Sequence, residues 1–184
     1  KKALFPIGVH TELREQKSRN RRVSLVQGNL TGNARMENSG TSARVYQNGV
    51  YGFSSMAECS GEAAETVLKA AAENALFMDR HVGRGKEPLP IIPCGGIPLS
   101  KKIQDAAQKH YIEFAKELDS YITAHCPKLS SRSVVAMEDS MEKIICTSDG
   151  YDGHICAPRS YVYVFLNSET TSGTPIELFV PFGG

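Results

Sequence analysis

The feature of this sequence that most restricts its fold is an Asn-Gly pair, Asn48–Gly49, between two short runs rich in β-branched and aromatic residues. A two-residue type I′ turn needs a positive φ at both central positions, and Asn and Gly tolerate that conformation. We therefore predict a β-hairpin that turns at this pair. Its register pairs Gln47 with Val50, Tyr46 with Tyr51, Val45 with Gly52 and Arg44 with Phe53.

The two faces of this hairpin differ in character. One face carries Arg44, Tyr46, Tyr51 and Phe53, and the other carries Ala43, Val45 and Gly52. A glycine inside a strand leaves room for another backbone or a helix to approach closely. Arg44, Tyr46 and Tyr51 are candidate peptide-binding residues, because such side chains contact and hydrogen-bond an extended chain. A second way to bind peptide is strand addition, in which an extended peptide pairs with the edge of the hairpin. The alternative is that Tyr51 and Phe53 lie in the core beneath a helix.

The first half of the chain switches from a strand pattern to a helix pattern. Residues 8–55 alternate in polarity between turn signals, which predicts a β-meander of four or five antiparallel strands. Residues 60–82 then repeat apolar side chains every three to four positions, which predicts a helix. Ser60 is its expected N-cap. The expected buried stripe consists of Val67, Ala71, Ala75 and Met78.

The second half repeats the alternation between helix and strands. Residues 83–99 are rich in proline and glycine and are expected to form a surface excursion. A second helix is expected from a Ser100 cap to a stop at Pro127, with a stripe of Ile103, Ala107, Tyr111, Phe114, Leu118 and Ile122. Strands are then predicted at 133–139, 143–150, 160–169 and 174–182. This order favours an α+β fold of one domain, residues 1–184, whose mainly antiparallel sheet comes from two β-meander blocks with two central helices packed on it.

Composition excludes several classes of protein. The chain is 41% hydrophobic and 22% charged, with a formal net charge of +1, as expected for a globular domain without a strong field for nucleic acid. The longest apolar run, YVYVFL, is too short to span a membrane. The 5 cysteines form no Cys-x-x-Cys pair, so we expect reduced thiols and a cytoplasmic protein.

The sequence offers metal ligands only in pairs. His10 and Glu12 share one strand face, as do His154 and Cys156. A zinc site needs three or four converging ligands, and no His-Glu-x-x-His helix or Cys-x-x-Cys knuckle supplies them. No Gly-x-Ser-x-Gly elbow is present either. We therefore expect no catalytic residue and no metal or other cofactor in this chain.

A basic cluster, KSRNRR, occupies residues 17–22 near Arg14. Phosphate binding is one interpretation. The other is a charged turn and strand end that discourages aggregation at a sheet edge. The absence of interleaved aromatic residues favours the second interpretation.

Several short motifs, taken in order, resemble the N-terminal domain of the TldD/PmbA family. The first is the polar strand HTELREQKSRNRRVSLVQGNL, followed by a Gly-x-x-x-Arg-Val segment at residues 40–45. An aromatic-Gly-Phe-Ser element at residues 51–54 and an alanine-rich helix at 61–80 come next. A Ser-Asp-Gly turn at 148–150 and a Pro-Arg step before YVYVFL complete the set. The resemblance spans nearly the whole chain.

The family is named for a proposed modulation of DNA gyrase and is understood as zinc metallopeptidases. The resemblance implies that zinc belongs to a C-terminal domain with a His-Glu-x-x-x-His helix, which this chain is expected to lack. It also implies a non-catalytic, substrate-guiding domain that helps form the chamber of a homo- or heterodimer acting on unfolded or modified peptides. The partners are then its own C-terminal domain and peptide, and neither membrane nor nucleic acid. The alternative is a nucleic-acid or protein binding module linked to DNA gyrase modulation.

Overall fold

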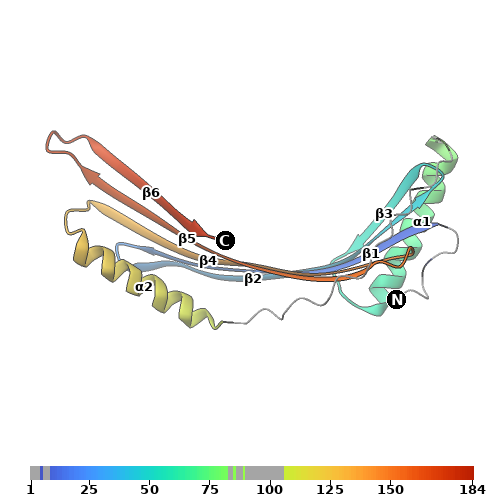
Figure 1. Ribbon diagram of the computed structural model, residues 1–184, viewed down its shortest axis with the longest axis horizontal. Coiled ribbons are helices and arrows are strands. Elements are labelled where there is room, and N and C mark those ends of the chain that lie inside the picture. Colours follow the sequence, from blue (N-terminus) through green and yellow to red (C-terminus); the bar gives the residue numbers. More distant parts are fainter. Residues whose placement is uncertain (1–4, 6–8, 83–84, 86–88, 90–105) are drawn as a thin grey trace. The chain divides into compact units, whose positions relative to one another are not determined.

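Figure 1 shows the fold as a computed structural model, which describes residue 5, residues 9–82, residues 85 and 89, and residues 106–184. The elements in chain order are β1 (His10–Val26), β2 (Asn29–Gln47), β3 (Val50–Met56), α1 (Gly61–Val82), α2 (Gln108–His125), β4 (Ser131–Thr147), β5 (Asp152–Glu169) and β6 (Pro175–Gly183). Nearly all of the expected excursion at 83–99, and the expected cap Ser100, lie outside the described residues. Neither described helix combines the length and apolarity needed to cross a membrane.

The strands form a 6-stranded sheet in the order β3-β2-β1-β4-β5-β6. Each meander block therefore contributes three neighbouring strands, and β1 and β4 join the blocks at the centre. Backbone hydrogen bonds from Gln27 to Arg132 and from Ser148 to Thr11 give the β1–β4 pair an antiparallel register. The predicted α+β class, with a mainly antiparallel sheet and two helices packed on it, is confirmed.

The strands are longer and fewer than the sequence predicted. Residues 8–55 contain three strands, because β1 continues through the basic cluster and runs for 17 residues. Likewise the predicted strand 133–139 and residues 143–147 of the next predicted strand are both part of β4, another strand of 17 residues, and residues 148–150 lie in the turn after it. Alternation along the chain was recognised, but charged and polar stretches were wrongly assigned to turns. The described structure keeps those stretches extended because each is paired on both sides within the sheet.

The chain divides into two compact units. Unit 1 comprises residues 1–18, 38–102 and 141–156, and unit 2 comprises residues 19–37, 103–140 and 157–184. Helix α1 and strand β3 belong to unit 1, whereas α2 and β6 belong to unit 2. The four long strands β1, β2, β4 and β5 contribute a section to each unit. The single domain expected from the sequence stays a prediction.

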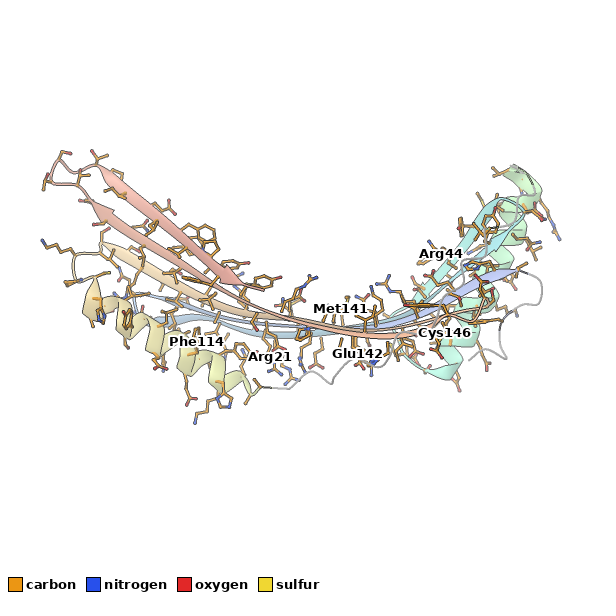
Figure 2. All side chains as sticks on the ribbon, viewed as in Figure 1. Arg21, Arg44, Phe114, Met141, Glu142 and Cys146 are labelled. Atoms are coloured by element: carbon orange, nitrogen blue, oxygen red, sulfur yellow. The ribbon has the colours of Figure 1, made fainter. Side chains whose placement is uncertain are left out.

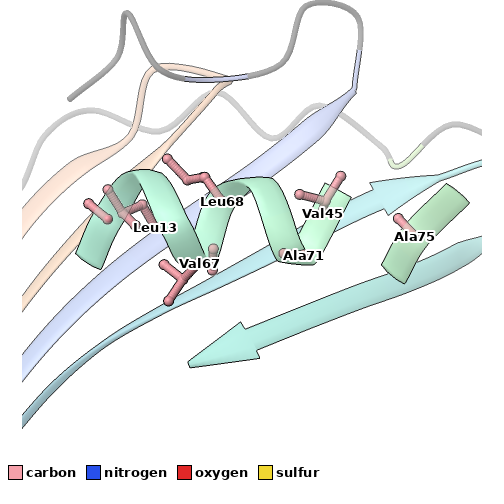
Figure 3. Packing of buried hydrophobic residues seen from close by; sticks show 8 residues of the cluster. Leu13, Val45, Val67, Leu68, Ala71 and Ala75 are labelled. Carbon is pink, nitrogen blue, oxygen red and sulfur yellow. The ribbon is translucent and has the colours of Figure 1, made fainter. Parts of the chain in front are cut away.

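The core of unit 1 forms where α1 packs on the sheet. The helix begins as predicted, because the Ser60 hydroxyl accepts a hydrogen bond of 3.0 Å from the Ala63 amide. Its buried side chains form one cluster with Leu13 and Val45 of the strands, which Figure 3 shows. The buried cluster comprises Leu13, Ala43, Val45, Ala64, Val67, Leu68, Ala71 and Ala75.

The predicted α1 stripe ends one turn early. Met78 is 36% exposed and does not belong to the buried cluster. The Asn48 side-chain amide donates a hydrogen bond of 2.8 Å to Asp79. Because Asn48 is in the hairpin turn, the helix residues next to Asp79 lie beside the turn and not beside the strands. Met78 therefore lies where the strands stop.

Gly52 explains how closely α1 approaches the hairpin. The strand register is the predicted one, with Val45 opposite Gly52. A Cβ atom added to Gly52 would lie 2.0 Å from the carbonyl oxygen of Ala71 and 2.3 Å from the backbone nitrogen of Ala75. The predicted close approach of a helix to this glycine is confirmed.

The core of unit 2 forms beneath α2. Val23 and Leu25 of β1 meet Ala115 and Ile122 of the helix in one buried cluster. The sequence predicted Phe114 as a member of this stripe, but its side chain is 47% exposed. Ala115 and Asp119 take the buried positions instead. The predicted stripe residue Ile103 lies outside the described residues.

Asp119 accounts for the error in the predicted α2 stripe. Its carboxylate accepts two hydrogen bonds from the Arg132 guanidinium, at 2.8 and 3.0 Å. An acidic residue can occupy a buried helix position when its charge is paired in this way. A rule that selects apolar residues could not assign this position.

Candidate functional site

The three residues predicted to bind peptide lie together on one face of the β2–β3 hairpin. The guanidinium carbon of Arg44 lies 5.1 Å from the ring centre of Tyr51, within the range of a cation–π contact. Tyr46 and Tyr51 are edge to face, with ring centres 4.9 Å apart. Arg44 also donates a hydrogen bond of 2.8 Å to Glu12 of β1, which holds the guanidinium over this face. Arg44 is labelled in Figure 2.

This hairpin face is open rather than covered by a helix. Tyr51 is 45% exposed and Phe53 is 58% exposed. The alternative in which these two rings form the core beneath a helix is therefore wrong. The reason is the strand alternation itself: α1 packs on the face of Gly52, and residues 51 and 53 point the other way.

An open groove lies beside the same face. Its volume is about 310 Å³, and Phe53 and Met56 give it an apolar end. Most of its other lining groups are hydroxyls, amides and one guanidinium. The complete lining is Arg14, Gln16, Ser18, Asn38, Ser39, Gly40, Thr41, Ser42, Phe53, Ser55 and Met56. We define the hairpin face of Arg44, Tyr46, Tyr51 and Phe53, together with this groove, as the hairpin surface.

The outer edge of β3 is partly occupied. The side-chain amide of Asn74 on α1 donates a hydrogen bond of 2.9 Å to the carbonyl oxygen of Phe53. That oxygen is one of the backbone acceptors an added strand would need. This acceptor of the hairpin edge is therefore already bonded within the chain.

The basic cluster is neither a turn nor a sheet edge. It lies within β1, at the centre of the sheet, and the side chain of Arg21 is only 1% exposed. One guanidinium nitrogen of Arg21 lies 3.5 Å from a carboxylate oxygen of Glu138, and a nitrogen of Arg19 lies 3.3 Å from the other. The favoured interpretation, a charged edge, is wrong. Two of the arginines serve a buried ionic cluster in unit 2, and Figure 2 labels Arg21 there.

The protonation of this ionic cluster follows from its partners. Burial by itself raises the pKa of Glu138, but hydrogen bonds from Ser140 and Tyr111 and the charges of Arg19 and Arg21 outweigh burial and lower it. The Tyr111 hydroxyl donates to Glu138 at 2.8 Å. Burial, together with that carboxylate, raises the pKa of Tyr111. Glu138 is therefore held ionised and Tyr111 neutral.

The two predicted ligand pairs have different outcomes. Nδ1 of His10 lies 2.9 Å from a carboxylate oxygen of Asp149, while Glu12 binds Arg44. His10 and Glu12 therefore bind different partners and not a common point. His154 and Cys156 do converge, and a third group, the Glu142 carboxylate, joins them. Glu142 was not predicted, because it lies on β4 whereas His154 and Cys156 lie on β5. Only the β4–β5 pairing, signalled by the Asp149–Gly150 turn, could have suggested it.

Comparison with known proteins agrees with this fold. Residues 11–75 match the family model described as PmbA/TldA metallopeptidase domain 1. No curated protein matches the chain. Among solved structures, TldE from Thermococcus kodakarensis shares 12% identity, with a TM-score of 0.72 over 98% of this chain. A candidate modulator of DNA gyrase from Thermotoga maritima shares 13%, with a TM-score of 0.70 over 96%. A second, from Bacteroides thetaiotaomicron, shares 15%, with a TM-score of 0.71 over 95%.

These likenesses show a shared fold, and the chain spans 40% of the length of each of the three structures. The matched residues run from β1 through β3 into α1, the part of the chain that builds the hairpin and its helix. Residues 11–75 are therefore similar to the first domain of PmbA/TldA metallopeptidases, and the chain shares the fold of the three solved structures.

Proposed function

We propose that this chain is the non-catalytic, substrate-guiding domain of a PmbA/TldD-type metallopeptidase, and that its hairpin surface holds extended peptide. The observation that carries the proposal is the exposed set of Arg44, Tyr51 and Phe53 beside an open groove of about 310 Å³. Aromatic and arginine side chains are enriched among residues that dominate binding energy.

The chemistry of the groove suits peptides of varied sequence. Its serine, asparagine and glutamine side chains offer both donors and acceptors, which match the repeating amide and carbonyl groups of an extended backbone. Phe53 and Met56 add apolar contact area, and methionine adapts to ligands of different shape. Such a surface selects for an unfolded chain rather than for one side chain, in keeping with unfolded or modified peptides as substrates.

Catalysis would belong to another part of the protein. The sequence contains no His-Glu-x-x-x-His segment, so the residues of this chain do not fit the family's catalytic zinc, and no chemical step is assigned to them. In this proposal the chain works beside its own zinc-bearing C-terminal domain, in a homo- or heterodimer that encloses the substrate.

A peptide titration tests the proposal. A fluorescent, unstructured peptide of mixed sequence is titrated with the chain, and binding is followed by anisotropy. We expect Tyr51→Ala to weaken binding by about 1 kcal/mol or more, because the exposed ring and its contact with Arg44 are lost. Phe53→Ala should have a similar effect at the apolar end of the groove.

Tyr121→Ala is the matched control, because Tyr121 is 61% exposed and lies on α2, in unit 2. It should leave peptide affinity unchanged. Equal losses for Tyr51→Ala and Tyr121→Ala would contradict the proposal. Tight, steeply salt-dependent binding of DNA without any peptide affinity would instead favour a nucleic-acid binding module.

A further inference from the structure

Three different metal-ligating side chains meet on one face of the β4–β5 pair in unit 1. The Nε2 atom of His154 lies 2.8 Å from Oε1 of Glu142 and 3.6 Å from Sγ of Cys156. All three ligand atoms lie within 4.8 Å of one another. His154 and Cys156 are two residues apart on β5, so the pleat directs them to the same face. Figure 2 labels Glu142 on β4.

The three side chains meet at one point and do not form a catalytic relay. In a catalytic relay, the nucleophile and the carboxylate bind opposite ring nitrogens of the histidine. Here the thiol and the carboxylate both face Nε2, so that nitrogen cannot activate the thiol while it donates to the carboxylate. A single point of convergence for nitrogen, sulfur and oxygen is what a metal ion requires.

The donor set indicates the class of metal. Zn²⁺ binds histidine nitrogen, cysteine thiolate and carboxylate oxygen, and sites with three protein ligands keep a fourth position for water. A thiolate and a carboxylate would together balance the 2+ charge of the ion. An ion can reach the site from solvent, because the side chain of Glu142 is 45% exposed. The side chain of His154 is more buried, at 15% exposed.

We propose that Glu142, His154 and Cys156 form a binding site for one Zn²⁺-class divalent ion. The site differs from a His-Glu-x-x-x-His centre in its ligands and goes beyond the proposed peptide binding. Binding would release the Cys156 thiol proton, shift the ring proton of His154 from Nε2 to Nδ1, and replace the His154–Glu142 hydrogen bond with two metal bonds. The ion would link β4 to β5 in unit 1. The sequence-based expectation of no metal depended on the missing third ligand, which Glu142 now supplies.

Cobalt titration tests the site, because Co²⁺ replaces Zn²⁺ at such sites and a thiolate bound to Co²⁺ gives a charge-transfer band in the near ultraviolet. The metal-free chain of 184 residues is titrated with CoCl₂ under reducing conditions. We expect about one Co²⁺ per chain, a charge-transfer band, and loss of the band on addition of Zn²⁺. Cys156→Ser should abolish the band and weaken binding by more than about tenfold.

Cys126→Ser is the control, because Cys126 is an exposed thiol that lies in unit 2. It should leave both the band and the affinity unchanged. Glu142→Gln should keep the band but weaken binding, and it remains informative if Cys156→Ser fails to fold by circular dichroism. Absence of a cobalt band in the wild-type chain would overturn the proposal. A band that survives Cys156→Ser, or affinity unchanged in Glu142→Gln, would also overturn it.

Discussion

The two units bury their helices by different means. In unit 1, α1 meets the sheet through alanines and Gly52, so backbone lies against backbone and the fit is steric. In unit 2, the apolar cluster beneath α2 is flanked by buried ionic groups, with Glu138 beside Arg21 and Asp119 beside Arg132. One helix depends on the absence of a side chain, and the other depends on charges that must be paired.

Each unit should therefore resist a different kind of perturbation. A steric interface is insensitive to pH but does not tolerate added volume, because protein interiors are close-packed. An ionic cluster tolerates small changes of shape but loses free energy when a group changes its charge. Three substitutions, Gly52→Val, Glu138→Gln and Lys17→Ala, test this comparison.

Gly52→Val should have the largest effect. The added Cβ would lie 2.0 Å from the Ala71 carbonyl oxygen, so α1 must move away from the hairpin. We expect a loss of at least about 4 kcal/mol in the free energy of unfolding, measured by urea denaturation. The loss should not depend on pH between 5 and 8.

Gly61→Ala is the matched control, because an added Cβ at Gly61 meets nothing within 4 Å. It should be neutral or slightly stabilising. Gly52→Ala adds only the clashing methyl group and keeps the measurement possible if the valine variant does not fold. An unchanged urea midpoint for Gly52→Ala would contradict the close packing of α1.

The hairpin was predictable because its signals are local. The Asn48–Gly49 turn fixes the register, and the register places Gly52 opposite Val45. The ionic cluster was not predictable, because Arg21 meets its carboxylate partner only through the β1–β4 pairing, far along the chain. The convergence of Glu142 with His154 and Cys156 was missed for the same reason. Sequence patterns assign residues to strand faces, but the partner across the sheet comes from topology.

Glu138→Gln should have the intermediate effect. Glutamine keeps the shape and some hydrogen bonds of Glu138 but removes the charge that faces Arg19 and Arg21. We expect a loss of about 2 kcal/mol in the free energy of unfolding at neutral pH. Asp139→Asn, a change at the exposed neighbouring residue, is the control and should have little effect.

The pH dependence separates an ionic role of Glu138 from a packing role. Its folded pKa lies below the ordinary value of 4.5, so its stabilising contribution is fully present above that pH and is lost as pH falls through the folded pKa. The difference between wild type and Glu138→Gln should therefore shrink on acidification below pH 4.5. A difference that stays constant down to the acid transition would show that shape, and not charge, matters at this position.

Lys17→Ala should have the smallest effect, although Lys17 belongs to the same basic cluster as Arg21. The two residues are four positions apart on β1, so the strand pleat places them on the same face. The two residues differ in burial. Arg21 is 1% exposed, and its guanidinium carbon lies 5.9 Å from the ring centre of Tyr111 on α2, whereas Lys17 is exposed. We expect Lys17→Ala to change the free energy of unfolding by less than about 0.5 kcal/mol. A loss comparable to that of Glu138→Gln would mean that the charges of the cluster act together, and that an exposed position on β1 supports the fold as strongly as a buried one.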